Sequence, residues 1–377
     1  MDTGVHDKQR LKELQALPLD RKILITQTRI IEWYTKWNGQ VYVSFSGGKD
    51  STVLLHIARQ CFPDIEAVFV NTGLEYPEIQ TFAKSFDNVT VIRPKMSFVD
   101  VIKNFGYPVI SKEVSQKIYE CYTDQDGHAS QSFDCHSEKV TRYGSRYDLS
   151  KWEPLRHTTF QISHRCCGIM KKAPTKAFER KFKKHPILAT MACESALRKT
   201  SWLRSGCNAF DSKRPISQPM SFWTERDVLE YIQKYNVPIA TVYGEIVSTN
   251  NGCSLCTTGC DRTGCIFCGF AAHNRGDERF IRLKETHPRQ YEYCINGGEY
   301  AWIGRYKANV KWTGIKFTNK DGSKMTQDQI ERFIEEHKDD PRFIFKKVWV
   351  PNKTGLGLGH VFDEINKIYG ENFIRYK

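Results

Sequence analysis

The sequence predicts an α/β protein in which helices cover both faces of a twisted parallel β-sheet, followed by a Cys-rich C-terminal extension. Short apolar runs at 41–45, 67–70 and 89–92 alternate with segments of helical periodicity, which is typical of parallel strands joined by crossover helices. The first two runs end in glycine-containing turns, and five cysteines lie between residues 253 and 268. Ligands of such sheets bind beyond the carboxyl ends of strands, so these two turns are the first candidate binding segments.

The composition is that of a globular protein with excess positive charge. The 377 residues include 56 Lys and Arg against 43 Asp and Glu, a formal net charge of +13, and 40% are hydrophobic. These values exclude global disorder and allow two domains, or one large domain with an appendage. The charge favours an anionic partner such as a nucleotide or a nucleic acid. We find neither the ~18 consecutive apolar residues of a membrane span nor a signal peptide, and therefore expect a cytoplasmic protein without a membrane partner.

Periodicity and composition divide the chain into three consecutive segments. Residues 1–39 form an N-terminal helical segment, with helical spacing of Leu, Ile and Trp. Residues 40–250 form the α/β domain, and residues 251–377 form the Cys-rich segment and a basic C-terminal region. Within the domain, residues 123–157 are rich in Asp, Ser, His and Tyr. This composition predicts an inserted polar loop that is mobile or ordered by a partner.

The turn after the first strand has the residues of a phosphate-binding loop. It reads Ser-Phe-Ser-Gly-Gly-Lys-Asp-Ser-Thr over residues 44–52, between a strand and a helix. Glycines let the backbone approach an anion closely, and the helix N-terminus adds N–H donors and a favourable dipole. An aspartate at a phosphate site makes chemical sense if it holds Mg²⁺ or orients a group. The predicted binding residues are Ser44, Ser46, Gly47, Gly48, Lys49, Asp50, Ser51 and Thr52.

This loop is not a Walker loop, but it resembles the S-G-G-x-D-S pyrophosphate loop of the N-type ATP pyrophosphatases. The resemblance implies an adenine nucleotide alpha hydrolase-like fold and cleavage of ATP between the α and β phosphates. Three further segments resemble the phosphoadenosine phosphosulfate reductase family within this superfamily. Residues 69–78 are similar to the family's D/N-T-G-x-x-x-P-E signature, and residues 193–198 are similar to its E-S-x-x-R element. Residues 214–228, followed by Val-Pro, resemble its P-[IL]…W-T-x-x-D-V…[IL]-P stretch. The landmarks keep the family order over roughly residues 40–270.

The resemblance implies roles for the binding residues outside the loop. The turn at 71–75 would take the adenosine side of the nucleotide. Glu194 belongs to the E-S-x-x-R element, in which the usual preceding G-x-R is replaced by Met-Ala-Cys. The additional nucleotide-binding residues are therefore Asn71, Thr72, Gly73, Glu75 and Glu194.

Four residues are predicted to be catalytic. Lys49 belongs to the loop that would hold the β and γ phosphates, and Mg²⁺ would lie near Asp50. Lys112 and Arg198 would neutralise charge that develops at the α phosphate, and the planar guanidinium suits a bidentate contact with phosphate or sulfate.

Two departures from the family pattern favour ATP over a sulfonucleotide. Reductases of this family usually carry a degenerate phosphate loop, whereas the loop here is intact. They also use a nucleophilic cysteine in a C-terminal E-C-G-x-H tail, whereas the last cysteine of this chain is Cys294, outside such a context. The missing tail argues against ordinary sulfonucleotide reduction.

The thirteen cysteines are clustered and not spread like a disulfide framework. Residues 164–174 resemble the C-C-x-x-x-K-x-x-P segment of adenylylsulfate reductases, in which the cysteine pair and a later C-x-x-C hold a 4Fe–4S cluster. The ligands implied here are Cys166, Cys167, Cys265 and Cys268, with Cys253, Cys256 and Cys260 as alternates or sulfur-carrying thiols. A self-contained zinc site from Cys253, Cys256, Cys265 and Cys268 is the alternative, since thiolates suit zinc as well; the absence of any metal is a third.

The leading hypothesis is an enzyme that adenylates a substrate with ATP and supports sulfur transfer, with DNA or tRNA as candidate acceptors and a protein as candidate sulfur donor. The basic run at 171–184 would follow a nucleic-acid backbone or form a solvated helix face. The first alternative is a sulfite-forming reductase of phosphoadenosine phosphosulfate or adenylylsulfate with its thiol elsewhere, for example at Cys260. The second is a non-catalytic nucleic-acid-binding module with structural zinc.

Overall fold

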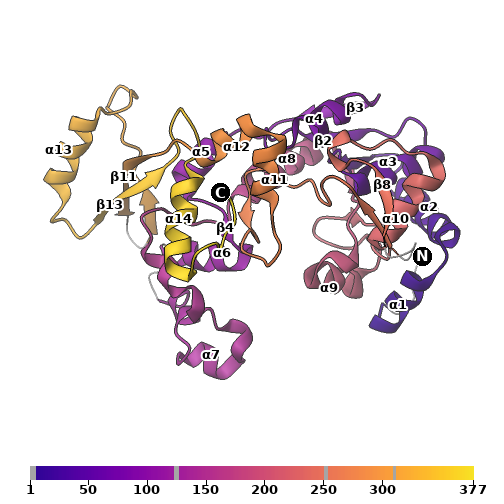
Figure 1. Cartoon of the computed structure of the whole chain (residues 1–377), viewed down its shortest axis with the longest axis horizontal. Helices are drawn as coiled ribbons and strands as arrows, with labels where there is room; N and C mark the ends of the chain where they lie inside the picture. The colour runs from indigo at the N-terminus through magenta and orange to yellow at the C-terminus, as the bar shows by residue number, and fades with distance from the viewer. Residues whose placement is uncertain (1–5, 123–126, 250–253, 309–310) are drawn as a thin grey trace. The chain divides into compact units, whose positions relative to one another are not determined.

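The computed structural model describes residues 6–122, 127–249, 254–308 and 311–377 (Figure 1). The chain folds into two compact units, each assembled from two separate stretches of sequence. Unit 1 comprises residues 1–95 and 170–266, and unit 2 comprises residues 96–169 and 267–377, as far as these are described. The three consecutive segments predicted from the sequence differ from this division, and their boundaries remain a prediction.

Unit 1 is built around a six-stranded sheet with the order β3-β2-β1-β5-β7-β6. Neighbouring strands are parallel, apart from the antiparallel pair of β6 and β7. This mostly parallel sheet confirms the predicted α/β class. The strands are β1 (Val41–Phe45), β2 (Ala67–Val70), β3 (Val89–Ile92), β5 (His185–Ile187), β6 (Asn208–Ala209) and β7 (Ile216–Ser217).

Helices cover both faces of this sheet because strand residues alternate between them. Val41, Val43 and Phe45 of β1 belong to a large buried cluster with residues of α2, α3 and α10. Tyr42, between them in sequence, packs instead against Phe178 of α8. The helices of unit 1 are α1 (Lys8–Ala16), α2 (Leu19–Lys36), α3 (Lys49–Cys61), α4 (Pro77–Lys84), α8 (Ala173–Phe182), α9 (Ala196–Ser205) and α10 (Glu225–Tyr235).

The last part of unit 1 leads from α10 to the cysteine-rich segment. A 3-10 helix, η6 (Thr241–Tyr243), precedes an antiparallel hairpin of β8 (Ile246–Thr249) and β9 (Ser254–Thr257). After the hairpin, the backbone N–H of Cys260 donates to Val242 O at 2.9 Å. The chain therefore returns to η6 immediately before residues 261–266.

Unit 2 contains a three-stranded antiparallel sheet, β12-β11-β13, and the parallel pair of β4 with β10. Its strands are β4 (Val109–Ile110), β10 (Gly269–Phe270), β11 (Glu299–Ala308), β12 (Lys311–Gly314) and β13 (Phe343–Val350). Its helices are α5 (Phe98–Phe105), α6 (Lys112–Cys121), α7 (Glu138–Tyr143), α11 (Arg279–Thr286), α12 (Pro288–Ile295), α13 (Gln327–His337) and α14 (Leu358–Tyr369). No helix in the described part of either unit is both long and apolar enough to cross a bilayer.

The predicted polar loop at 123–157 is helical where it is described. Residues 127–157 contain α7 and three 3-10 helices, which hydrogen bonds tie together. Leu149 N donates to Ser132 O at 2.7 Å, and Lys139 Nζ donates to the Ser132 hydroxyl at 2.7 Å. Residues 123–126 lie outside the described residues. Polar side chains here cap and cross-link short helices, a role that composition alone does not reveal.

Candidate nucleotide site

The predicted phosphate loop lies between the carboxyl end of β1 and the N-terminus of α3, as expected. Ser44 is still within β1, opposite Val68 of β2. The chain turns at Gly47, which has φ +72°, and a Cβ atom there would lie 2.9 Å from Ile79 Cγ2. Both the left-handed backbone and the close approach of α4 therefore require glycine at position 47.

Hydroxyl groups hold the loop in one conformation. Ser46 N donates to Ser51 Oγ at 3.1 Å, and the two serine hydroxyls are 2.9 Å apart. Ser51 Oγ and Thr52 Oγ1 both donate to Gly48 O, at 2.9 and 3.0 Å. The helix start is thus ordered by its own side chains before any ligand binds.

Lys49 is 3% exposed and its ammonium is held on two sides. Its Nζ donates to the backbone carbonyl of Asp261 at 2.6 Å and forms an ion pair with Glu225 Oε1 at 3.0 Å. Its backbone N–H donates to the hydroxyl of Tyr243 at 3.1 Å. Burial raises the pKa of Tyr243 to about 12, so this hydroxyl remains protonated at neutral pH.

Asp50 carries a buried carboxylate oxygen that accepts no hydrogen bond within the described chain. Its Oδ1 is inaccessible to solvent, and burial raises the pKa of the carboxyl group above its ordinary value, whereas the Lys49 ammonium lowers it. A buried carboxylate oxygen without a partner is costly. Mg²⁺ at nucleotide sites is commonly bound by one or two carboxylates together with phosphate oxygens. The orphaned oxygen of Asp50 therefore fits a magnesium–nucleotide ligand.

The turn at 71–75 is held by its own side chains. Glu75 accepts hydrogen bonds from Thr72 N at 3.1 Å and Thr72 Oγ1 at 2.6 Å. Asn71 Oδ1 accepts from Gly73 N at 3.1 Å. Gly73 has φ +75°, and a Cβ atom there would have open space around it. These contacts give Asn71, Thr72 and Glu75 a part in shaping the turn, while their predicted contact with adenosine remains a prediction.

The E-S-x-x-R element forms the start of α9, where Ser195 is the N-cap residue. Arg198 forms an ion pair with Glu194, whose Oε2 also accepts from Met191 N at 2.8 Å. Burial and the guanidinium of Arg262 lower the pKa of Arg198. Glu194 thus fixes Arg198, and its own predicted contact with nucleotide remains a prediction.

Cys193 occupies a position of the usual family motif and lies near the same charged groups. Its Sγ donates to Trp223 O at 3.4 Å. Burial of the thiol raises its pKa, although the residue as a whole is exposed, and Arg262 lowers it. The thiol is therefore kept protonated more strongly than an ordinary cysteine.

Sequence reasoning missed several residues, distant in sequence, that contact either the phosphate loop or a residue beside it. Two of them had a signal: Glu225 is the Glu of the W-T-x-x-D-V-like stretch, and Arg262 lies three residues before Cys265. The others contact Lys49 or Tyr243 and come from segments without a phosphate motif. The missed residues are Glu225, Tyr243, Asp261, Arg262 and Thr263.

Lys112 belongs to unit 2, whereas the phosphate loop and Arg198 belong to unit 1. It follows the N-cap residue Ser111 at the start of α6 and is exposed. Burial is the largest cause that lowers the pKa of His164, and the Lys112 ammonium lowers it further. Its predicted role at the α phosphate remains a prediction.

The predicted cluster ligands are divided between the two units. Cys166 and Cys167 belong to unit 2, with their sulfurs 3.9 Å apart, as does Cys268, whereas Cys265 belongs to unit 1. In the described part of the chain, no group of three or more Cys, His, Asp or Glu side chains is arranged to hold a metal ion. The soft thiolate donors fit an iron–sulfur cluster or zinc chemically, and the ligand set remains a prediction.

The alternate ligands are placed in unit 1 where they are described. Cys256 lies in β9 opposite Val247, and Cys260 is buried with its carbonyl accepting from Thr257 Oγ1 at 3.0 Å. Cys253 lies outside the described residues. The zinc alternative, which needs Cys253, therefore remains a prediction.

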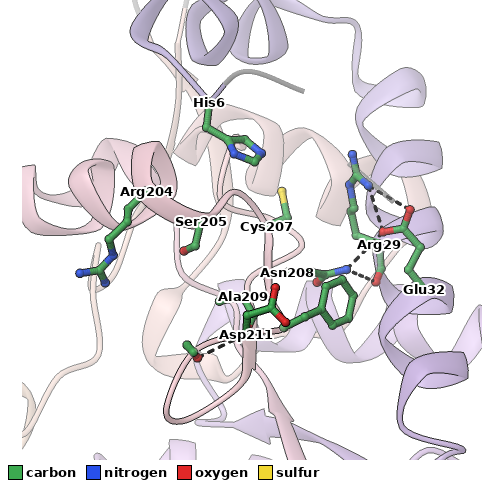
Figure 2. Close-up of a pocket in the computed structure, with 11 residues that line it drawn as sticks. His6, Arg29, Glu32, Arg204, Ser205, Cys207, Asn208, Ala209 and Asp211 are labelled. Atoms are coloured by element: carbon green, nitrogen blue, oxygen red, sulfur yellow. Dashed lines mark hydrogen bonds and ion pairs between the residues drawn. The ribbon is translucent and has the colours of Figure 1, made fainter. Parts of the chain in front are cut away.

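A cavity of about 510 Å³ in unit 1 lies between α2 and the segment that joins α9 to β6 (Figure 2). Arg29 forms an ion pair with Glu32 at 2.9 Å, and Asn208 Nδ2 donates to Arg29 O at 2.9 Å. Arg29 and Glu32 thus bind each other at the cavity wall. The lining residues are His6, Arg29, Glu32, Arg204, Ser205, Cys207, Asn208, Ala209, Phe210, Asp211 and Ser212.

Comparison with known proteins agrees with the geometry of the loop. Residues 40–126 match the family described as the phosphoadenosine phosphosulfate reductase domain. Residues 40–126 thus resemble a phosphoadenosine phosphosulfate reductase domain. This match confirms the resemblance predicted from the sequence, and it includes β1, the phosphate loop and the turn at 71–75.

The curated relatives of this chain are distant. Two uncharacterized proteins of Methanocaldococcus jannaschii are 23% and 24% identical over 305 and 266 residues, which are 78% and 70% of this chain and 56% and 42% of those proteins. The chain thus spans about half the length of these two relatives. An adenosine 5'-phosphosulfate reductase of Geobacillus kaustophilus is 22% identical over 234 residues, 60% of this chain and 77% of that protein.

Solved structures that match are more distant still. The phosphoadenylyl-sulfate reductase of Candida auris has a TM-score of 0.33 and 12% identity, covering 62% of this chain and 90% of that one. The FMN adenylyltransferase of Candida glabrata has a TM-score of 0.34 and 13% identity, covering 62% of this chain and 64% of that one. TM-scores this low carry no argument about fold or function.

Proposed function

We propose that this chain binds ATP with Mg²⁺ and cleaves it between the α and β phosphates, adenylating a substrate in support of sulfur transfer. One observation carries the proposal: an intact phosphate loop with a buried lysine beside an aspartate whose Oδ1 has no hydrogen-bond partner in the described chain. A degenerate loop would not need both groups. The reaction is assigned to the cytoplasm, where thiolates are kept reduced.

The residues of unit 1 divide the work of binding and charge neutralisation. The N-terminal turn of α3 and the hydroxyls of Ser46, Ser51 and Thr52 would hold the β and γ phosphates, with Lys49 as a point charge. Asp50 would hold Mg²⁺, which neutralises phosphate charge when bound. Arg198 would offset the charge that grows at the α phosphate as pyrophosphate leaves. Lys112 is proposed to join it there.

The turn at 71–75 is proposed to receive the adenosine. Its backbone is ordered by the hydrogen bonds of Glu75 and Asn71, and the space beside Gly73 is open. A preordered turn lowers the entropy cost of binding a flat, rigid ligand. Glu194 takes part indirectly by holding Arg198.

The cysteines would provide the sulfur chemistry. Cys166, Cys167, Cys265 and Cys268 would hold a 4Fe–4S cluster, which supplies electron transfer or a place for sulfur when bound. Zinc, with Cys253, Cys256 and Cys260 as further thiols, is the alternative metal. No step of the proposed ATP reaction depends on the cluster.

The acceptor is proposed to be a nucleic acid, DNA or tRNA, with a separate protein as sulfur donor. In the described residues, the basic run at 171–184 has Glu179 as its acidic member, and Glu179 is occupied by Arg214 Nε at 2.8 Å. Lys184 pairs with Glu66 at 2.7 Å. Lys176, Arg180, Lys181 and Lys183 are exposed on or beside α8, and such a surface favours a polyanion.

A direct assay compares two nucleotides with protein purified without oxygen. ATP with Mg²⁺ and a nucleic-acid acceptor is expected to yield pyrophosphate, because an acceptor oxygen displaces it from the α phosphate. Phosphoadenosine phosphosulfate with a thiol reductant is expected to yield no sulfite. Sulfite without pyrophosphate would contradict the proposal and establish the reductase instead.

The reductase is the second candidate, and one finding favours it. The Geobacillus kaustophilus relative, which is named an adenosine 5'-phosphosulfate reductase, matches over 77% of its length. A reductase needs a nucleophilic thiol, and Cys260, buried next to the 261–263 segment, is the candidate. Sulfite formation that is lost in Cys260→Ser would support this alternative.

A further inference from the structure

The residues on both sides of Arg262 are held at the phosphate loop, one by its backbone carbonyl and the other by its side chain. Before it, the carbonyl of Asp261 accepts from Lys49 Nζ at 2.6 Å. After it, the hydroxyl of Thr263 lies 2.6 Å from that of Tyr243, which in turn accepts from Lys49 N. One direct contact with Lys49 and one through Tyr243 leave the Cα of Arg262 little freedom. Its side chain, 63% exposed, therefore starts from a fixed point beside the loop.

Arg262 and Arg198 share one carboxylate. Glu194 forms an ion pair with Arg198, and its Oε1 lies 3.9 Å from Arg262 Nη1. The other carboxylate oxygen also accepts a backbone N–H of Met191. A guanidinium carries five N–H donors, more than one shared carboxylate can accept, so the pair keeps donors for an anion.

The direction in which the pKa of Arg198 is shifted agrees with this geometry. The Arg262 guanidinium, after burial, lowers the pKa of Arg198, as expected for two like charges that are close together. The two guanidinium groups therefore lie close enough to act on one anion together.

We propose that Arg262 binds an anionic group of the nucleotide together with Arg198. The inference rests on the proposed nucleotide-binding function and adds to it a residue outside the recognised motifs. A guanidinium donates two parallel N–H bonds to a tetrahedral oxyanion. Phosphate and sulfate offer the same oxygens, so the group bound is the α phosphate of the nucleotide or a sulfate attached to it.

Calorimetric titration with ATP and Mg²⁺ tests the proposal. Arg262→Ala is expected to weaken ATP binding by about tenfold or more, the loss typical of a charge-assisted hydrogen bond. Arg262→Lys keeps the charge but loses the planar guanidinium, so its affinity for ATP should lie between those of the wild type and Arg262→Ala. Arg10→Ala is a matched control, because Arg10 is 57% exposed and pairs with Glu13 at 3.2 Å; it should bind ATP like the wild type.

The same titration with adenosine 5'-phosphosulfate separates the two anions. A larger loss for the sulfate compound than for ATP would assign Arg262 to the sulfate, and equal losses would assign it to the α phosphate. Unchanged ATP affinity in Arg262→Ala would overturn the inference and leave the proposed function intact. A lowered melting temperature without ligand, with Arg262→Lys no better than Arg262→Ala, would also overturn it by showing a structural role. If the wild type binds neither nucleotide, the proposed function fails and the inference with it.

Discussion

Asp50 shows at the scale of one residue how a functional group is maintained at a cost in stability. Its Oδ1 is buried and accepts no hydrogen bond in the described residues, and burial raises its pKa. The carboxylate form is thus disfavoured in the folded protein. We regard this cost as the signature of a group arranged for a cationic ligand.

The pH dependence of stability follows from the direction of this shift. A carboxyl group with a raised folded pKa favours folding fully below its unfolded pKa, and that contribution is lost as pH rises through the folded pKa. Asp50→Asn removes the titration. The free energy of unfolding of the variant, relative to wild type, should therefore increase between pH 4 and pH 7. Urea denaturation across this range measures it, and a constant difference would show that Asp50 does not titrate differently on folding.

Gly47 and Gly73 form a matched pair for testing the loop backbone. Both have positive φ, but a Cβ atom would meet Ile79 at 2.9 Å at position 47 and open space at position 73. Gly73→Ala should cost about 1 kcal/mol in unfolding free energy from the left-handed backbone alone. Gly47→Ala should cost ~1–3 kcal/mol more because a well-packed neighbour must move. Equal losses of unfolding free energy in urea denaturation would show that α4 shifts to accommodate the added methyl group without destabilising the protein.

At the scale of elements, α2 and α10 are joined by one buried and one exposed ion pair. Lys22 and Asp227 are 2% and 9% exposed with Nζ and Oδ2 2.6 Å apart, whereas Lys234 and Asp20 are 47% and 69% exposed. Asp227 Oδ2 also accepts from Thr224 N at 2.7 Å, at the N-cap of α10. The buried pair therefore fixes the helix start from which Glu225 reaches Lys49.

Breaking the buried pair should be much more costly than breaking the exposed one. Lys22→Met leaves an uncompensated buried carboxylate and should lower the free energy of unfolding by ~3–5 kcal/mol. Lys234→Met, which severs the exposed pair between the same helices, should lower it by less than about 1 kcal/mol. Chemical denaturation of both variants measures the difference. Similar losses would mean that water reaches Lys22.

The strands near the phosphate loop were predictable because local pattern decides them. The apolar runs at 41–45, 67–70 and 89–92 coincide with β1, β2 and β3. The partners of Lys49 were not predictable. Asp261 contributes a backbone carbonyl, which has no sequence signature, and Tyr243 comes from a segment with no phosphate motif.

At the scale of the whole molecule, each compact unit is assembled from two stretches that are distant in sequence. Residues 96–169 separate β3 from α8, yet the two flanking stretches form one sheet. Periodicity identifies strands but not which distant stretches pair, so the sequence does not reveal that residues 1–95 and 170–266 form one compact unit. The metal ligands depend on this same long-range information, which explains why spacing alone left alternatives among residues 253–268.

The metal content distinguishes the alternatives for the cysteines. Protein purified without oxygen should contain iron and acid-labile sulfide, with about four of each per chain as a 4Fe–4S cluster requires. Cys268→Ser should lower both, and Cys61→Ser, in α3, should leave both unchanged. Iron and sulfide assays with zinc determination measure this; zinc without iron or sulfide would contradict the cluster.

The most direct test of the central claim, that the phosphate loop binds ATP, is calorimetric titration of wild type and Lys49→Met with ATP and Mg²⁺. Methionine keeps the length of the buried side chain and removes its charge. Saturable binding by wild type, weakened about tenfold or more in Lys49→Met and unchanged in Lys12→Ala on exposed α1, is the predicted result. Equal affinity of wild type and Lys49→Met, or no binding by wild type, would contradict the account.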